Sequence, residues 1–149
     1  MNIVIGNDHA AVELKERIVK YCMAKGFSVA DLGVSAEEKA DYPDKAEEVC
    51  SEYLKGRYDY AILCCGTGIG ISISANKIKG IRCALPQNKF AAQMAKEHNN
   101  ANAIAFGGRI EYPEPVEEML DAFFDNSFAG DRHTGRVEKI NSLDGKSCC

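Results

Sequence analysis

The sequence lacks an excess of positive charge, a long apolar run and a leader-like start. Among its 149 residues, 22 acidic side chains outnumber 18 basic ones, which gives a net charge of −4. Nucleic-acid and anionic-membrane binders need a basic surface, so neither partner is expected. No stretch approaches the roughly 18 apolar residues of a membrane span, and residues 1–4 begin a strand rather than a signal peptide. We therefore expect a cytoplasmic protein.

The cysteine pattern also lacks the features of a disulfide or zinc protein. The seven cysteines are odd in number, and three of them, Cys22, Cys50 and Cys83, lie inside expected helices or strands. They show neither Cys-x-x-Cys nor the Cys/His spacing of a zinc site. We expect reduced thiols and no bound metal. A C-terminal tail is expected over about residues 142–149, and Cys148 and Cys149 at its end are expected to be mobile and oxidisable.

Short apolar runs alternate with helical hydrophobic patterns along the chain. Strands are predicted over 3–5, 27–32, 58–63, 81–85 and 103–106, and helices over 11–25, 43–55, 69–78, 88–98, 113–126 and 132–140. Right-handed crossovers between such strands produce a parallel sheet, with successive strands side by side and helices over both faces. The expected fold is one α/β domain over residues 1–149, a three-layer α/β/α sandwich with a five-stranded, Rossmann-like parallel sheet.

A glycine-rich turn follows the third strand and opens a helix, over residues 64–72. Gly66, Gly68 and Gly70 let the backbone approach a ligand closely, and the first N–H groups of the helix can hold negative charge. Cys65 lies at the edge of the turn, where these amides favour a thiolate. Small apolar filling is the competing interpretation of this cysteine. Neither the dinucleotide fingerprint nor the Gly-Lys-Ser/Thr of a phosphate-binding loop is present.

Several polar or glycine-rich segments follow the expected strands. Ligands of parallel sheets bind beyond the carboxyl ends of the strands. We therefore expect four segments to share one rim: Asp8-His9, Asp41-Tyr42, Cys65 to Gly70, and Gly107 to Arg109. Asp8 has a second interpretation, because aspartate is also a common helix N-cap.

Two further groups of side chains also admit two interpretations. His98 lies near the C-terminus of its helix, where a histidine is favoured electrostatically without any catalytic role. Arg132 and Arg136 share a helix face with Lys139, and like charges at this spacing cost about 0.2 to 0.5 kcal/mol. A bound phosphate would reverse that cost through charge-assisted hydrogen bonds, whereas a solvated basic edge needs no ligand.

Short motifs spread over nearly the whole chain together carry a family resemblance. They are Gly6-Asn7-Asp8-His9, Asp41-Tyr42-Pro43, the segment from Cys65 to Lys77, Gly80-Ile81-Arg82, His98-Asn99, the segment from Ala105 to Arg109, Arg132-His133 and Arg136-Val137. In combination they resemble the type B ribose-5-phosphate isomerases, the family that includes allose-6-phosphate and galactose-6-phosphate isomerases.

The resemblance implies interconversion of ribose 5-phosphate and ribulose 5-phosphate through ring opening and a cis-enediolate. It gives Cys65 the role of base between C1 and C2, and it gives His98 the opening of the furanose ring with help from Asp8. Thr67 would exchange protons with the sugar oxygens, while the amides of Gly66 to Gly70 would stabilise the enediolate.

The resemblance also implies a phosphate site, the remaining substrate contacts and an assembly. Phosphate binding falls to His9, Arg109, Arg132 and Arg136, and the other substrate-binding positions are Tyr42, Gly66, Gly68, Ile69, Gly70 and Asn99. Neither a cofactor nor a metal is implied. The family implies a homodimer with shared sites, in which His98 and Arg109 reach the partner's cysteine, with a tetramer as a further step. Two alternatives stay open: a six-carbon sugar phosphate isomerase, and a non-catalytic module that binds a sugar phosphate or nucleotide.

Overall fold

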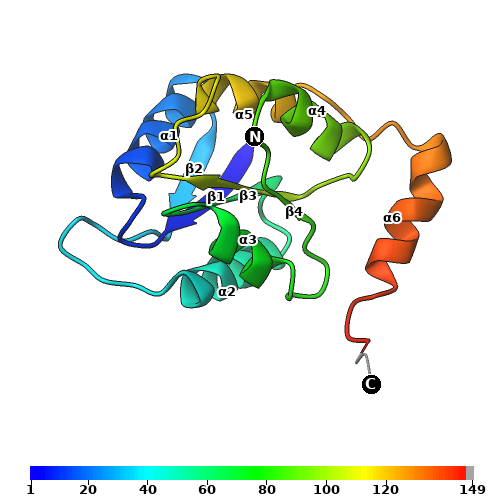
Figure 1. The fold of residues 1–149 in the computed structure, drawn as a ribbon, viewed down its shortest axis with the longest axis horizontal. Helices are drawn as coiled ribbons and strands as arrows, with labels where there is room; N and C mark the ends of the chain where they lie inside the picture. The colour runs from blue at the N-terminus through cyan, green and yellow to red at the C-terminus, as the bar shows by residue number, and fades with distance from the viewer. Residues whose placement is uncertain (147–149) are drawn as a thin grey trace.

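The computed structural model describes residues 1–146, in which strands alternate with helices (Figure 1). The predicted tail residues Cys148 and Cys149 lie outside the described residues. In chain order the elements are β1 (Asn2–Asn7), α1 (Val12–Ala24), β2 (Ser28–Asp31), α2 (Tyr42–Tyr53), β3 (Tyr60–Cys65), α3 (Ile69–Ala75), β4 (Cys83–Ala84), α4 (Lys89–Glu97), β5 (Ala103–Gly107), α5 (Val116–Phe124), the 3-10 helix η1 (Asp131–His133) and α6 (Thr134–Asn141).

Within residues 1–146 the strands form one parallel five-stranded sheet in the order β2-β1-β3-β5-β4. The expectation that successive strands lie side by side is wrong for two of the four steps along the chain. β1 lies between β2 and β3, and β5 lies between β3 and β4, which leaves β4 at the edge. All five residues of β5 are buried, whereas the two residues of β4 are only partly buried. Interior positions of parallel sheets favour such continuously apolar strands.

Alternating side chains divide the core into two layers, one on each face of the sheet. Ile3 and Ile5 of β1 pack into the layer that contains α1, α4 and α5, whereas Val4 packs into the layer with α2 and α3. Figure 1 shows these two groups of helices on opposite sides of the sheet. The predicted three-layer α/β/α sandwich is therefore confirmed.

α5 starts later than expected, and α6 lies outside the two helical layers. α5 begins at Val116 rather than 113, because Pro115 takes the extended N-cap conformation and a proline disfavours helical geometry in the residue before it. α6 stands apart from both helical layers, beyond the β4 end of the sheet (Figure 1). The Arg82 Nη1 group donates a hydrogen bond to Asn141 Oδ1 at 3.1 Å, and the Gly80 amide donates to Asp144 Oδ2 at 2.9 Å. These bonds fix the C-terminal segment to the start of β4.

The carboxyl ends of three neighbouring strands meet at one rim. Asn7 of β1 pairs with Cys64 of β3, and Cys65 pairs with Gly107 of β5. The chain winds from β1 to β2 in one direction and then crosses to β3 on the other side of β1. The crevice between β1 and β3 is thus the switch point at which parallel sheets bind ligands.

Candidate active site

The glycine-rich turn after β3 forms the floor of the rim. Gly68 has φ +76°, a left-handed conformation that other residues adopt only at a cost. Its amide N–H points back at Cys65, with 3.2 Å between the Gly68 nitrogen and Cys65 Sγ. The Thr67 hydroxyl oxygen accepts a hydrogen bond from the Ile69 amide at 3.3 Å. The predicted sequence of strand, glycine turn and helix is confirmed.

A second turn, after β5, packs directly against the first. The Gly108 amide donates to the Cys65 carbonyl at 2.8 Å, and the Arg109 amide donates to the Gly66 carbonyl at 2.9 Å. Gly107 in turn donates to the Tyr112 hydroxyl at 2.8 Å. Sequence reasoning missed Tyr112, which it treated only as part of the approach to α5. The two turns therefore hold each other through backbone hydrogen bonds.

The adjacent cysteines 64 and 65 have different surroundings because they point to opposite faces of β3. Cys64 is enclosed in the layer of α1, α4 and α5, and this burial raises the pKa of its thiol above the ordinary value. Cys65 faces the other layer, is 3% exposed, and lines the hollow at the rim. Of this pair, Cys65 is the thiol that a ligand at the rim can reach.

The residues after β1 form the opposite wall. Asp8 Oδ1 accepts a hydrogen bond from the Ala10 amide at 2.8 Å, whereas the N-cap of α1 is Ala11. Asp8 therefore stabilises the turn before the helix rather than capping the helix itself. His9 Nδ1 lies 3.2 Å from the Ala40 carbonyl, which can only accept, so Nδ1 donates and Nε2 is left for a ligand.

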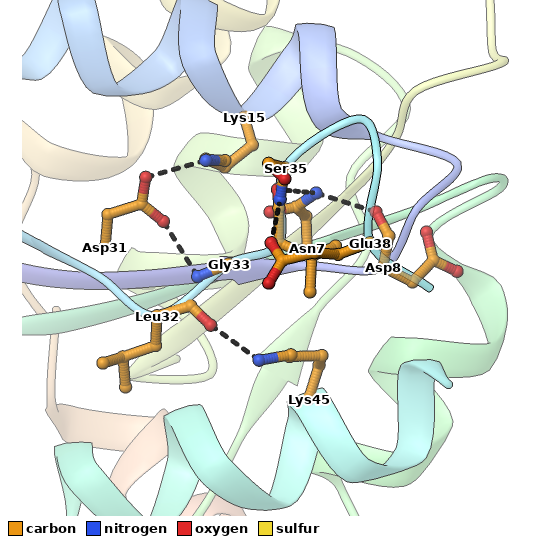
Figure 2. Close-up of polar contacts among 10 residues, drawn as sticks. Asn7, Asp8, Lys15, Asp31, Leu32, Gly33, Ser35, Glu38 and Lys45 are labelled. Atoms are coloured by element: carbon orange, nitrogen blue, oxygen red, sulfur yellow. Dashed lines mark hydrogen bonds and ion pairs between the residues drawn. The ribbon is translucent and has the colours of Figure 1, made fainter. Parts of the chain in front are cut away.

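A polar cluster fixes the loop that leads from β2 to Tyr42 (Figure 2). Asn7 is fully buried, and its Nδ2 donates to the Asp8 carbonyl at 2.7 Å. Asp31 accepts hydrogen bonds from Lys15 Nζ and from the Gly33 amide, each at 2.8 Å. The same loop is held from below, because Lys45 Nζ donates to the Leu32 carbonyl at 2.9 Å.

Tyr42, at the end of this loop, closes the rim against the helix after the glycine turn. A Cβ added to Gly70 would lie 2.7 Å from the Tyr42 ring, so the ring packs directly on the glycine backbone. The resulting hollow has a volume of about 380 Å³. Its lining residues are Asp8, His9, Ala10, Tyr42, Cys65, Gly66, Thr67, Ile69, Gly70 and Arg109. All were expected at the site except Ala10, and the four segments predicted to share a rim do share it.

The other expected site residues do not line this hollow. His98 ends α4, a helix that runs back from the rim towards the start of β5. Its neighbour Asn99 accepts a hydrogen bond at its carbonyl from Arg82 Nε at 3.3 Å, and Arg82 directly precedes β4. His98 and Asn99 therefore lie at the amino edge of the sheet, opposite the rim that holds Cys65.

Two of the three arginines predicted to bind phosphate, Arg132 and Arg136, lie on the side of His98. Arg132 Nε donates to His133 Nε2 at 3.2 Å, and the His133 ring stacks on the His98 ring with 4.1 Å between centroids. Arg132 and Arg136 are exposed on η1 and α6. Arg109 lies apart from this cluster, because it lines the hollow of its own chain and contacts the glycine turn there.

Two general properties of residues 1–146 bear on the chemistry. These residues contain no group of three or more His, Cys, Asp or Glu side chains placed to hold a metal ion. None of the helices described in this range has the length and apolar character needed to cross a membrane.

A parallel α/β sandwich with a thiol beside backbone amides at its switch point defines a small-molecule site suited to proton transfer. The chain belongs to the Ribose/Galactose Isomerase family, whose model matches residues 3–140. It is an aldose–ketose isomerase.

Individual relatives match over nearly the whole chain. Ribose-5-phosphate isomerase B of Escherichia coli is 39% identical over 142 residues, which cover 95% of each chain. D-erythrulose-4-phosphate isomerase of Pectobacterium atrosepticum is 40% identical over 141 residues, covering 94% of this chain and 93% of the relative. The structure of Clostridium thermocellum ribose-5-phosphate isomerase B superposes with a TM-score of 0.91 at 40% identity, covering 96% of this chain and 97% of that one.

Proposed function

We propose that this isomerase interconverts ribose 5-phosphate and ribulose 5-phosphate, a reaction of the pentose phosphate pathway, in the cytoplasm. The observation that carries the proposal is the Cys65 thiol. Its sulfur accepts a hydrogen bond from the Gly68 amide, and it lines a hollow that His9 and Arg109 also line. The names of the Escherichia coli and Clostridium thermocellum relatives support the substrate. A reducing compartment suits a mechanism that needs a free thiol.

Cys65 is the proposed base. As a thiolate it removes the C2 proton of the open aldose, the C2 electrons form the C1–C2 double bond, and the C1 carbonyl oxygen becomes an enediolate oxygen. The thiol then returns the proton to C1 as the C2 carbonyl forms, which completes the ketose. Thr67 carries the proton that must move between the two oxygens.

The backbone amides of the glycine turn stabilise the enediolate in this proposal. The Gly68 N–H donates to Cys65 Sγ, so this donor already stabilises the thiolate beside the place where the enediolate forms. Such preorganised donors act in the transition state without further rearrangement, and losing one costs about 2.7 to 4 kcal/mol in comparable enzymes. Tyr42 and Ile69 form the walls that shield this chemistry from water.

Ring opening is proposed to need a second subunit. His98 lies at the edge of the sheet opposite Cys65, and β5 alone spans five residues, or about 17 Å, between those edges. No side chain crosses that distance, so His98 of one chain acts on the sugar at Cys65 of its partner. The sugar hydroxyls are bound by Asn99 from the chain that supplies His98 and by Asp8 from the chain that supplies Cys65. We therefore propose a homodimer, which can pair into a tetramer.

Exposed apolar side chains beside the glycine turn support this assembly. Ile69 and Ile73 lie one turn apart on α3 and are 53% and 55% exposed, and Phe90 at the start of α4 is 70% exposed. A partner would cover them and bring its Arg132 and Arg136 to the hollow. The phosphate is then held by these two arginines together with His9 and Arg109 of the first chain.

Mixing two inactive variants tests the shared site. Cys65→Ala and His98→Asn chains, expressed together in equal amounts, form mixed dimers in half of the cases. Each mixed dimer keeps one site with both an intact Cys65 and an intact His98, so about a quarter of wild-type turnover returns. Absence of recovery in dimers shown to be mixed would contradict the shared site, whereas an inactive wild type would contradict the reaction.

Substrate length is tested on the same protein. We expect kcat/KM to be highest for ribose 5-phosphate when it is compared with allose 6-phosphate and erythrose 4-phosphate. A higher value for either of the other two would replace the proposed substrate within the same reaction. If no deuterium from the solvent enters C1 or C2 of any of these three sugar phosphates, the result would instead favour a non-catalytic module that binds a sugar phosphate.

A further inference from the structure

The third histidine of the chain, His133, has no role in the mechanism above. Its side chain is nearly buried, with 7% of the residue exposed, and it contacts two residues that have a role there, His98 and Arg132. The backbone turns sharply just before it, where Gly130 and Asp131 both have positive φ values of 68° and 44°. The Ala129 amide donates to the Glu97 carbonyl at 2.9 Å, which fixes this turn to the end of α4. The 3-10 helix η1 therefore starts directly beside His98.

The His133 ring contacts both neighbours through different parts of its surface. Its face stacks on the His98 ring, with 4.1 Å between centroids and 11° between planes. Its edge accepts a hydrogen bond at Nε2 from Arg132 Nε at 3.2 Å. A guanidinium can only donate, so His133 Nε2 carries no proton and the ring is the neutral tautomer protonated at Nδ1.

The surroundings of His133 favour this neutral form. Burial lowers the pKa of His133 below the ordinary value, and the nearby His98, Arg132 and Arg136 lower it further. A charged ring would lose its bond from Arg132 and would repel the positive groups around it.

We propose that His133 is a positioning residue with two separable tasks: its ring face orients His98 for ring opening, and its Nε2 orients Arg132 for phosphate binding. This inference rests on the proposed function, because it acts through the roles given there to His98 and Arg132. The stack restrains the imidazole plane of His98, and the hydrogen bond restrains one guanidinium edge of Arg132. The other edge of the guanidinium is left for a phosphate oxygen.

Two substitutions separate the tasks. His133→Phe keeps an aromatic ring against His98 but removes the acceptor for Arg132. We expect KM for ribose 5-phosphate to rise about tenfold, the worth of one hydrogen bond to a charged group, while kcat stays within about twofold. His133→Gln keeps an acceptor within reach of Arg132 but removes the stacked ring. We expect kcat for ribose 5-phosphate to fall about tenfold, the worth of one stacked ring pair, with KM within about twofold.

A second assay separates ring opening from proton transfer. Ribulose 5-phosphate is open-chain, because its C5 oxygen carries the phosphate and cannot close a furanose ring. Exchange of its C1 hydrogen with solvent deuterium therefore needs Cys65 but no ring opening. We expect His133→Gln to leave this exchange rate within about twofold of wild type, although turnover of ribose 5-phosphate falls about tenfold. A residue that merely stabilised the fold would lower both rates together.

Thr134→Ala, at the exposed next position, is the matched control, and thermal unfolding midpoints of all variants are compared at one protein concentration. The proposal is wrong if both His133 variants change the same kinetic parameter, if neither changes any, or if His133→Gln slows exchange as much as turnover. A wild type without turnover or exchange would contradict the proposed function itself.

Discussion

Replacing Gly68 by alanine is the most direct test of how the glycine turn is built. The residue has φ +76°, and a left-handed conformation costs an alanine about 1 to 2 kcal/mol. The added Cβ would also lie 2.6 Å from Leu85 Cδ1 and 2.9 Å from the carbonyl carbon of Phe106. Leu85 can rotate away, but Phe106 belongs to β5 and its backbone cannot. Such overpacking costs a further 1 to 3 kcal/mol or so.

The sum, about 2 to 5 kcal/mol, is a large share of the roughly 5 to 15 kcal/mol that stabilises a typical domain. Two other glycines separate the contributions. Gly56 has φ +77° with nothing within 4 Å of an added Cβ, so Gly56→Ala should show only the conformational cost. Gly135 lies in α6 with open space around it, and Gly135→Ala should stabilise the helix by up to about 1 kcal/mol.

Urea unfolding of the three variants at one protein concentration measures these differences. We expect the midpoint to fall most for Gly68→Ala, less for Gly56→Ala, and to rise slightly for Gly135→Ala. Turnover at a temperature where all variants are folded should fall for Gly68→Ala alone, by about 10² to 10³, because the amide beside Cys65 moves. Equal free energies of unfolding for Gly68→Ala and Gly56→Ala would refute the reasoning about the turn.

Four further predictions follow from individual contacts. Cys65→Ala should lower kcat by about 10² to 10⁴ while inorganic phosphate still binds, as calorimetry would show. Tyr112→Phe leaves the Gly107 amide without its acceptor and should cost about 1 to 3 kcal/mol in urea unfolding. Ile73→Asp should give monomers in sedimentation analysis and abolish turnover, since it places a charge on the proposed contact surface. Folding lowers the pKa of His133, so just below pH 6.5 the unfolded chain binds more protons than the folded chain. The free energy of unfolding of the wild type should therefore fall as the pH is lowered through this range, and it should fall more steeply than that of His133→Phe.

Most of the fold was predictable because each element has a local signal. The apolar runs and helical periodicities indicated all five strands and the order of the helices, and the three glycines from Gly66 to Gly70 indicated the turn. The strand order was less accessible, since it depends on how completely each strand can be buried. Nothing local to Cys83 and Ala84 shows that their strand lies at the edge beyond β5.

The residues of the site also fall into two groups, those that a sequence rule predicts and those that no such rule predicts. The rule that ligands bind at the carboxyl ends of parallel strands was enough to gather Asp8, Cys65 and Arg109 at one rim. No such rule predicts a side chain that hydrogen-bonds to, or stacks on, a residue far away in the sequence. Tyr112, which accepts from Gly107, precedes two prolines and carried no signal beyond a helix start, and the contact of His133 with His98 joins residues 35 positions apart.

The separation of Cys65 from His98 follows from the fold rather than from any single contact. In a parallel sheet every crossover helix must run back from the carboxyl rim to the amino edge before the next strand can begin. A residue that ends such a helix, as His98 ends α4, is therefore carried to the edge opposite the glycine turn. One chain cannot bring both groups to one sugar, so an enzyme that uses both needs a second subunit, and parallel topology therefore supports the shared site that we propose.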